Sequence, residues 1–192
     1  PHIFVALHIF APHWREQFGS CIIDMLKLKP SVLVGHPKWK EVLQVIKHDE
    51  RRYFIGKKSC HSFNYKKMPQ TFIFDVLKET EGKLAMSLEE GTHCHSTYHY
   101  IFPEIEEWHR EQEAFLRKHR ELRNLFGFPR KFYGSLTDAF FREAISFIPQ
   151  STVGCITNIA YANMQTLIES SSRYEHWDLL NNKHDSILMQ VP

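Results

Sequence analysis

Three polar side chains recur at a four-residue step in the first half of the chain: Lys57, His61 and Tyr65. On a helix, residues four apart project from one face and drift by only about 40° per step. A lysine ammonium suits phosphate oxygens, and a tyrosine ring can stack on or pack under a base. The row therefore predicts a nucleotide-binding helix face, and the alternative is an ordinary solvated face.

A second set of candidate residues is the tripeptide His184-Asp185-Ser186, which precedes an apolar run near the end of the chain. We expect it at a tight turn between two strands, where a carboxylate is held rigidly and faces outward. Mg²⁺ prefers oxygen ligands and often binds through one or two carboxylates together with substrate phosphates. Asp185 is therefore a candidate metal ligand, although an aspartate that only serves the geometry of the turn explains the same pattern.

A third row, Arg142, Ser146 and Gln150, has the same four-residue step. Arginine and glutamine on one helix face can contact a sugar–phosphate backbone and the minor-groove edges of bases. The alternative is an exposed polar stripe opposite an apolar core face made by Phe140, Ala144, Phe147 and Ile148.

Basic residues are concentrated in two stretches, although the net charge is only +2. Residues 47–67 contain seven lysines and arginines, among them Arg52, against Asp49 and Glu50. Residues 117–131 contain six, among them Arg130, around the single acid Glu121. Two basic patches on a nearly neutral chain suit a polyanionic partner, with a pair of solvated helix faces as the alternative.

These residues must be positioned mainly by helices. Apolar periodicity and prolines predict helices over residues 13–29, 49–65, 72–83, 87–102, 103–122 and 136–169, the last with a kink or break at Pro149. Ser87 and Glu90 form a capping-box pattern. Residues 177–180 and 186–191 are expected to be short strands of a hairpin. The fold class is α+β, a mostly helical chain with a terminal antiparallel hairpin.

Composition sets the remaining limits. A chain of 192 residues that is 43% hydrophobic fits one domain or two small lobes sharing a core. No apolar run is long enough for a membrane span. Four cysteines without paired spacing give no disulfide framework and favour a reducing cytoplasm. We expect both ends of the sequence to be cuts through a larger protein.

Taken in order, these segments resemble the C-terminal part of family A DNA polymerases, the group of the bacterial repair polymerase and many phage replicases. Their fingers helix carries Lys and Tyr at the spacing of Lys57 and Tyr65, with an aromatic residue at the place of His61. The resemblance continues through Tyr98 and Phe102-Pro103-Glu104-Ile105-Glu106-Glu107-Trp108, through residues 124–132, through Arg142 and Pro149-Gln150-Ser151-Thr152-Val153-Gly154, and ends at His184-Asp185. It covers nearly the whole chain.

The resemblance implies a fingers subdomain over residues 1–135 and a returning palm segment over 136–192, whose hairpin carries the catalytic aspartate. Lys57 would bind the incoming deoxynucleoside triphosphate and protonate the leaving pyrophosphate, Tyr65 and His61 would line the sugar and base pocket, and Arg52 would assist. Asp185 would be one of two aspartates in a two-metal Mg²⁺ site, and His184 would contact the primer end. The residues expected to hold the primer–template duplex are Arg142, Gln150, Arg130 and Ser146.

The expected activity is template-directed DNA synthesis, in which a primer 3′-hydroxyl attacks the α-phosphate of a deoxynucleoside triphosphate. The other bridging aspartate of the family would fall a few residues before Pro1, so the 192 residues should be inactive alone. The sequence departs from the family at Tyr53 (usually Arg), Lys66 (Gly), Phe128 (Arg) and Asn182 (Gln). The expected location is the cytoplasm of a bacterial or phage-infected cell, with no membrane partner.

Two other functions fit parts of the pattern. One is a non-catalytic nucleic-acid-binding module, because the basic patches and the polar helix rows need no chemistry. The other is a zinc-dependent nuclease, suggested by His93, Cys94, His95 and His99 among 13 histidines. His95 and His99 lie one helical turn apart, but no second pair follows at a familiar zinc-ligand distance.

Overall fold

The computed structural model describes all residues, 1–192, and divides into two compact units, Pro1–Arg110 and Glu111–Pro192. The first unit contains α1 (His2–Ile9), α2 (Ala11–Phe18), α3 (Cys21–Leu26), α4 (Pro30–Leu33), α5 (Trp39–His48), α6 (Glu50–Phe63), α7 (Pro69–Glu79) and α8 (Leu88–Ile101). Helix α9 (Pro103–His119) runs from the first unit into the second. The second unit continues with β1 (Glu121–Arg123), β2 (Pro129–Lys131), α10 (Asp138–Ser170), the 3₁₀ turn η1 (Ser172–Tyr174), β3 (Asp178–Lys183) and β4 (Ser186–Gln190).

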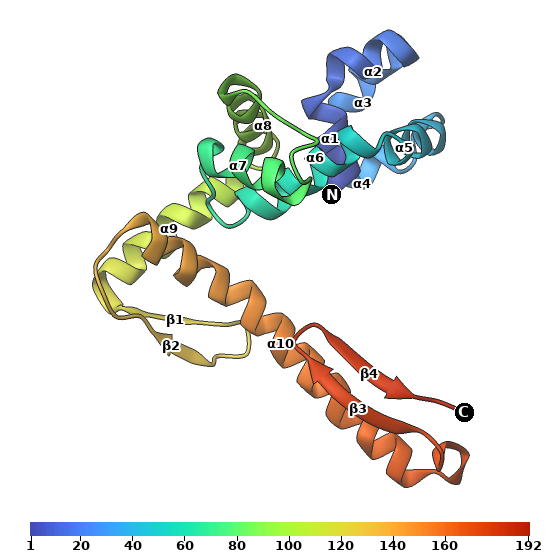
Figure 1. Cartoon of the computed structure of the whole chain (residues 1–192), viewed down its shortest axis with the longest axis vertical. Helices are drawn as coiled ribbons and strands as arrows, with labels where there is room; N and C mark the ends of the chain where they lie inside the picture. Colours follow the sequence, from blue (N-terminus) through green and yellow to red (C-terminus); the bar gives the residue numbers. More distant parts are fainter. The chain divides into compact units, whose positions relative to one another are not determined.

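The first unit is built around α1, which is packed against α5, α6 and α8 (Figure 1). Five of its eight residues are buried, so the helix has core on more than one side. One apolar cluster joins α1 to α2, α3 and α5 and includes Trp14 and Trp39. A second joins it to α6, α7 and α8 and includes Phe63, Phe72 and Tyr98. Burial of these large side chains is the main force that holds the helices together.

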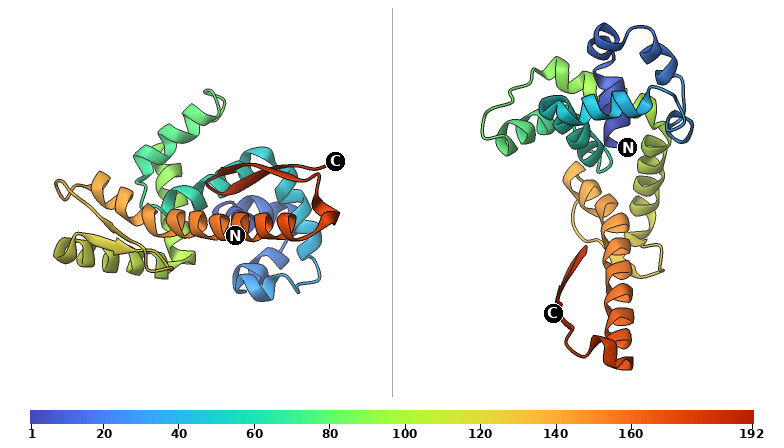
Figure 2. Two further views of the ribbon diagram at one scale, coloured as in Figure 1. Left: turned by 90° about the horizontal axis from the view of Figure 1, so that it is seen from below. Right: turned by 90° about the vertical axis from the view of Figure 1, so that its right-hand side faces the viewer.

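The second unit has a smaller core, where β1, β2 and the first half of α10 meet around Leu116, Phe132 and Phe141. The C-terminal part of this unit has no buried core, and no residue after Thr157 is buried. The β3–β4 hairpin lies along the C-terminal half of α10, and Figure 2 shows the two elements side by side in both views. Both sheets are two-stranded and antiparallel. The predicted α+β class is confirmed, with helix as the main component.

Most predicted helices are present with small shifts of their ends. The capping box at Ser87 is complete: the Ser87 hydroxyl accepts from the Glu90 N–H (3.1 Å), and the Glu90 carboxylate accepts from the Ser87 N–H (2.7 Å). Pro103 separates α8 from α9, as predicted, and the terminal hairpin is confirmed. No helix of the structure combines the length and the apolar character that a membrane crossing requires.

Two predicted boundaries were wrong, and one of the two outcomes expected at Pro149, a break, is absent. The single helix over residues 13–29 is split into α2 and α3, because Gly19 has φ +69°, outside helical geometry. The helix that begins at Pro103 ends at His119 rather than 122: Arg120 has φ +55° and the chain turns into β1. Instead of breaking at Pro149, α10 continues as one helix through it. Buried Ala144, Ile145 and Thr152 anchor α10 on both sides of the proline, which removes only one helical hydrogen bond.

Candidate functional site

Helix α6 is anchored at its start by Asp49. One Asp49 carboxylate oxygen accepts from the Arg52 N–H (2.9 Å), and the other accepts from the Arg52 guanidinium (2.5 Å). This is an N-cap reinforced by an ion pair, and the negative charge also suits the positive end of the helix dipole. The Arg52 guanidinium lies 5.7 Å from the ring centres of Phe10 and Trp14. Arg52 was predicted to bind nucleotide. In the structure its guanidinium contacts Asp49, Phe10 and Trp14 of its own unit.

Lys57 and His61 lie on the exposed face of α6, one turn apart, as the spacing predicts. Lys57 is exposed and makes no ion pair, so its ammonium is available to an anionic ligand. The His61 ring lies 5.3 Å from the ring of His2 on α1. The two side chains therefore present a cation and an imidazole on the same helix surface.

Tyr65 lies beyond the end of α6, so the third position of the predicted row is not on the helix. Helix α6 ends at Phe63, and Tyr65 is a half-buried residue of the following turn, where its N–H donates to the Ser62 carbonyl (3.2 Å). The end of the helix is fixed at Asn64: its side-chain oxygen accepts from the Tyr98 hydroxyl, and its carbonyl accepts from His109 Nε2 (2.8 Å). These contacts from α8 and α9 hold the residue that follows the last residue of α6.

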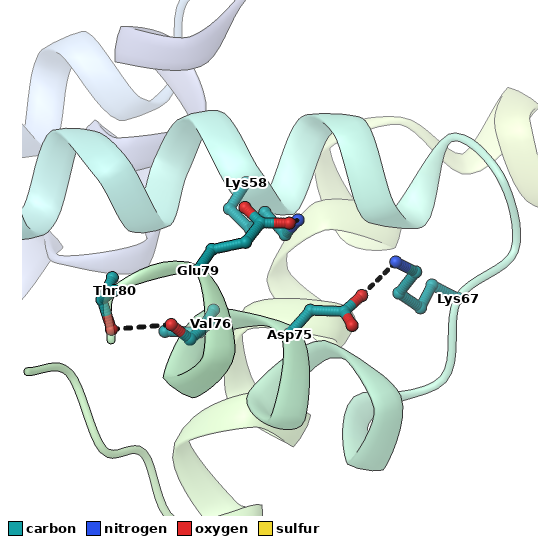
Figure 3. Close-up of polar contacts among 6 residues, drawn as sticks. All are labelled: Lys58, Lys67, Asp75, Val76, Glu79 and Thr80. Atoms are coloured by element: carbon teal, nitrogen blue, oxygen red, sulfur yellow. Dashed lines mark hydrogen bonds and ion pairs between the residues drawn. The ribbon is translucent and has the colours of Figure 1, made fainter. Parts of the chain in front are cut away.

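Two of the lysines in the first basic stretch are neutralised by α7. Lys58 pairs with Glu79 and Lys67 pairs with Asp75, as Figure 3 shows. Both pairs join α6, or the turn that follows it, to α7. The ion pairs leave the predicted basic patch with fewer unpaired charges than the sequence indicates. Lys57 is therefore a better candidate than Lys58 or Lys67 for binding an anionic ligand.

A cluster of histidines packs beside Phe63, on α8 and α9. The rings of His95 and His99 are 4.5 Å apart, and the His99 and His109 rings are 6.4 Å apart. Burial, with His95 and His109 nearby, lowers the pKa of His99 to about 4, and the Glu106 carboxylate opposes this shift. His99 Nδ1 is buried and has no hydrogen-bond partner. Burial of the cluster therefore favours the neutral form of these rings.

This arrangement provides no set of ligands for the zinc site that the sequence suggested. His93 Nε2 donates to the Ile9 carbonyl (3.0 Å), and burial raises the pKa of the Cys94 thiol to about 12. No group of three or more His, Cys, Asp or Glu side chains in the chain is arranged to hold a metal ion.

The His184-Asp185 pair forms the two-residue turn of the β3–β4 hairpin, between the paired residues Lys183 and Ser186. His184 has φ +51°, and the Asp185 N–H donates to the Lys183 carbonyl (2.6 Å). Both side chains of the turn are exposed. The hairpin is tied to α10 by the amide of Asn182, which donates to Asn158 Oδ1 (2.6 Å). Asp185 is thus held on a hydrogen-bonded turn, but one carboxylate does not make a two-metal site, and the predicted Mg²⁺ remains a prediction.

The predicted row of polar residues lies on α10, but its members differ in exposure. Gln150 is exposed, whereas Arg142 and Ser146 are half-buried, and the Ser146 hydroxyl donates to the Glu143 carbonyl (2.8 Å). Arg130, on β2, reaches this part of the helix: its guanidinium pairs with Glu143 (2.5 Å) and lies 4.9 Å from the Phe132 ring centre. Arg130 is therefore close to the start of α10 but is paired with an acid there, and the predicted duplex-binding role of these residues stays a prediction.

The predicted site residues divide between the two units. Lys57, His61, Tyr65 and Arg52 belong to the first, and Arg130, Arg142, Ser146, Gln150, His184 and Asp185 belong to the second. This division, after Arg110, differs from the functional boundary expected at residue 135, which stays a prediction.

Strands β1 and β2 of the second unit were not predicted from the sequence, and the loop of residues 124–128 joins them. Asn124 is buried there, and its side-chain oxygen accepts from the N–H groups of Phe126 and Phe128 (both 3.0 Å). The signal in the sequence was an asparagine followed by a glycine three residues later, a pattern typical of a turn. Three-residue strands on either side are too short to give a clear alternating pattern.

Comparison of the sequence with protein-family models and with curated proteins finds no match in either.

Proposed function

We propose that the chain is the fingers and part of the palm of a family A DNA polymerase, and that it takes part in template-directed DNA synthesis. The observation that carries the proposal is the agreement between element type and role in the three candidate segments. Lys57 and His61 are exposed on a helix, Gln150 is exposed on a long helix, and Asp185 is exposed at a hairpin turn. The order of these segments is the order of the family's motifs.

Lys66 gives further support at a place where the sequence departs from the family. This residue has φ +58°, the left-handed conformation, and the family has glycine at the same place. Glycine adopts that conformation without steric cost, whereas other residues lose roughly 1–2 kcal/mol. A backbone that needs a left-handed residue after Tyr65 accounts for the family's glycine, and this chain keeps the turn with a lysine.

In the proposed reaction, the residues of this chain bind and position substrates. The Lys57 ammonium attracts the triphosphate and can donate a proton to the leaving pyrophosphate oxygen. The His61 ring packs against the base or sugar. Gln150 and Arg142 donate hydrogen bonds to the duplex near the primer end. Fixed charges and positioning of this kind supply much of the catalysis in phosphoryl transfer.

Asp185 needs a second carboxylate for the family's reaction. We assign none of the 192 residues to that role, and no group of three or more potential ligands forms in the chain. The exposed Lys57 and His61 and the two basic stretches also suit a second candidate function, binding of nucleic acid or nucleotide without catalysis.

Primer extension tests the proposal. The 192-residue chain is compared with a version that also includes the residues encoded upstream, each as wild type and as Asp185→Asn. We expect incorporation only by the longer wild type. Lys57→Ala in the longer version should reduce incorporation, and Lys58→Ala, whose ammonium is paired with Glu79, serves as the matched control. If the longer protein is folded and incorporates nothing, the binding-only function replaces the polymerase proposal.

A further inference from the structure

The loop of residues 124–128 exposes three large apolar side chains at the end of the β1–β2 hairpin. Leu125 is 82% exposed, Phe126 is 46% exposed and Phe128 is 61% exposed. They are consecutive in the loop apart from Gly127, which has φ +82° and allows the chain to turn between the two phenylalanines. Such a group of exposed apolar side chains is a common sign of a binding surface.

The backbone that carries these side chains is fixed, because each of its five N–H groups is hydrogen-bonded. The Asn124 side chain accepts from Phe126 and Phe128. The Asn124 N–H donates to the Phe128 carbonyl (3.1 Å), and the Gly127 N–H donates to the Asn124 carbonyl (2.9 Å). The Leu125 N–H donates to the Thr152 hydroxyl of α10 (3.3 Å). The loop therefore presents its rings in a set geometry, which lowers the entropy lost on binding.

Cations flank the apolar group on both strands. Arg123 donates to the Gly127 carbonyl (3.0 Å) and also contacts Glu121 (2.8 Å), so its guanidinium lies beside the loop. On the other strand Lys131 is exposed and makes no ion pair, and it lies opposite Glu121 at the end of the hairpin away from the loop. The stretch 117–131 has six lysines and arginines and one acid. Arg123 is paired with Glu121 and Arg130 with Glu143, but the charge that remains around the hairpin is still positive and favours an anionic ligand.

Aromatic side chains beside cations suit single-stranded nucleic acid. Its unpaired bases offer flat faces that stack on phenyl rings, and its phosphates pair with arginine and lysine. In a duplex the base faces are covered by neighbouring base pairs, so exposed rings gain little from it except at an end. A protein partner would also cover apolar rings, but the excess of positive charge favours the nucleic acid.

We propose that the 124–128 loop is a stacking platform for single-stranded nucleic acid, with Phe126 and Phe128 contacting bases and Arg123 and Lys131 contacting phosphates. This inference deepens the proposed function, because it names the part of the chain that would hold an unpaired stretch of a template. It rests on that function only in taking nucleic acid as the partner.

Binding of a fluorescently labelled single-stranded oligonucleotide, followed by anisotropy, tests the platform. Base stacking on an aromatic side chain contributes about 1–3 kcal/mol, so Phe126→Ala with Phe128→Ala should weaken binding by about tenfold or more. Phe74→Ala on α7 is the matched control, because Phe74 is 62% exposed and lies in the other unit. Phe128→Tyr should keep the affinity, and Phe128→Leu should lose part of it, which separates stacking from general apolar contact. Higher salt should weaken binding of the wild type.

Three results would overturn the platform. One is unchanged affinity in the double variant, and another is an equal loss in Phe74→Ala. The third is concentration-dependent self-association that disappears in the double variant while oligonucleotide binding persists, because it would make the loop a contact between copies of the chain. If the double variant binds normally and the longer protein still extends primers, only the platform fails. If the wild type binds no oligonucleotide and extends no primer, the proposed function fails with it.

Discussion

Gly56 of α6 packs against Ala6 of α1 so closely that a side chain on Gly56 has no room. A Cβ on Gly56 would lie 2.6 Å from the Ala6 Cβ and 2.9 Å from the His2 carbonyl oxygen. Contacts that short force backbone or side chains to move. The close approach of the two helices also sets where Lys57, the next residue of α6, projects.

We therefore expect Gly56→Ala to lower the free energy of unfolding by about 1–3 kcal/mol, because overpacking outweighs the better helix propensity of alanine. Urea denaturation followed by circular dichroism measures the change. Gly154→Ala is the control, since Gly154 lies in α10 with no atom within 4 Å of an added Cβ. It should be stabilising by about 0.5–1 kcal/mol. A Gly56→Ala protein as stable as the wild type would contradict the close α1–α6 contact.

The histidine cluster makes stability depend on pH. Burial lowers the pKa of His99 from 6.5 to about 4, and burial also lowers the pKa values of His95 and His109, with Glu106 opposing in each case. Between about pH 6.5 and 4 the unfolded chain binds more protons than the folded one. The free energy of unfolding should therefore have its full value above pH 6.5 and should fall as the pH is lowered from 6.5 towards 4.

Urea midpoints at pH 7.5, 6 and 5 check this expectation. His99→Phe should reduce the pH dependence without a large loss at pH 7.5, because His99 Nδ1 makes no hydrogen bond that the change would break. His176→Ala is the control, since His176 is exposed and belongs to the second unit. A pH profile that stays the same in His99→Phe would mean that other groups dominate the titration.

Local sequence predicted the elements whose signals are local. The capping box at Ser87, the proline at position 103 and the apolar strands around His184 each act within a few residues, and each was confirmed. Periodicity alone failed at Gly19, because apolar residues on either side keep helical spacing even where a glycine breaks the helix. Helix α1 has no clear polar face, since most of it is buried, and so its pattern gave no amphipathic signal.

The candidate site depended more on distant contacts. The position of Tyr65 follows from Tyr98 and His109, which hold Asn64 from other helices. The pairing of Lys58 joins residues 21 positions apart, so the excess of charge in the sequence overstated the basic surface. By contrast, the exposure of Lys57 and Asp185 was predicted, because the helix face and the hairpin turn are local features.

The two ion pairs between α7 and its neighbour should differ in strength. The Lys67 and Asp75 side chains are 27% and 23% exposed, whereas in the other pair Glu79 is 50% exposed and Lys58 is 14% exposed. Water and salt screen an exposed pair, so Glu79→Gln should cost less than about 1 kcal/mol. Asp75→Asn removes a charged partner from a more sheltered contact and should cost about 1.5 kcal/mol or more.

A double-mutant cycle with Lys67→Met and Asp75→Asn, measured by urea denaturation at low and high salt, isolates the pair. The coupling should be larger than in the equivalent Lys58–Glu79 cycle and should depend less on salt. Equal couplings in the two cycles would show that burial does not distinguish the pairs.

Asn124 should control the order of the β1–β2 loop, because one buried side chain accepts two of its N–H groups and donates to Cys155 Sγ (3.3 Å). Asn124→Ala leaves these groups without their partner and should lower the free energy of unfolding of the second unit by about 1–3 kcal/mol. Asn124→Asp keeps the acceptor oxygen and should recover much of that loss.

Hydrogen exchange at the amides of Phe126 and Phe128 is the direct measurement, and both should exchange faster in Asn124→Ala. Asn163→Ala, at an exposed position of α10, is the matched control. Slow exchange at both amides in Asn124→Ala would mean that the strands alone hold the loop, and that the asparagine has no part in presenting its rings.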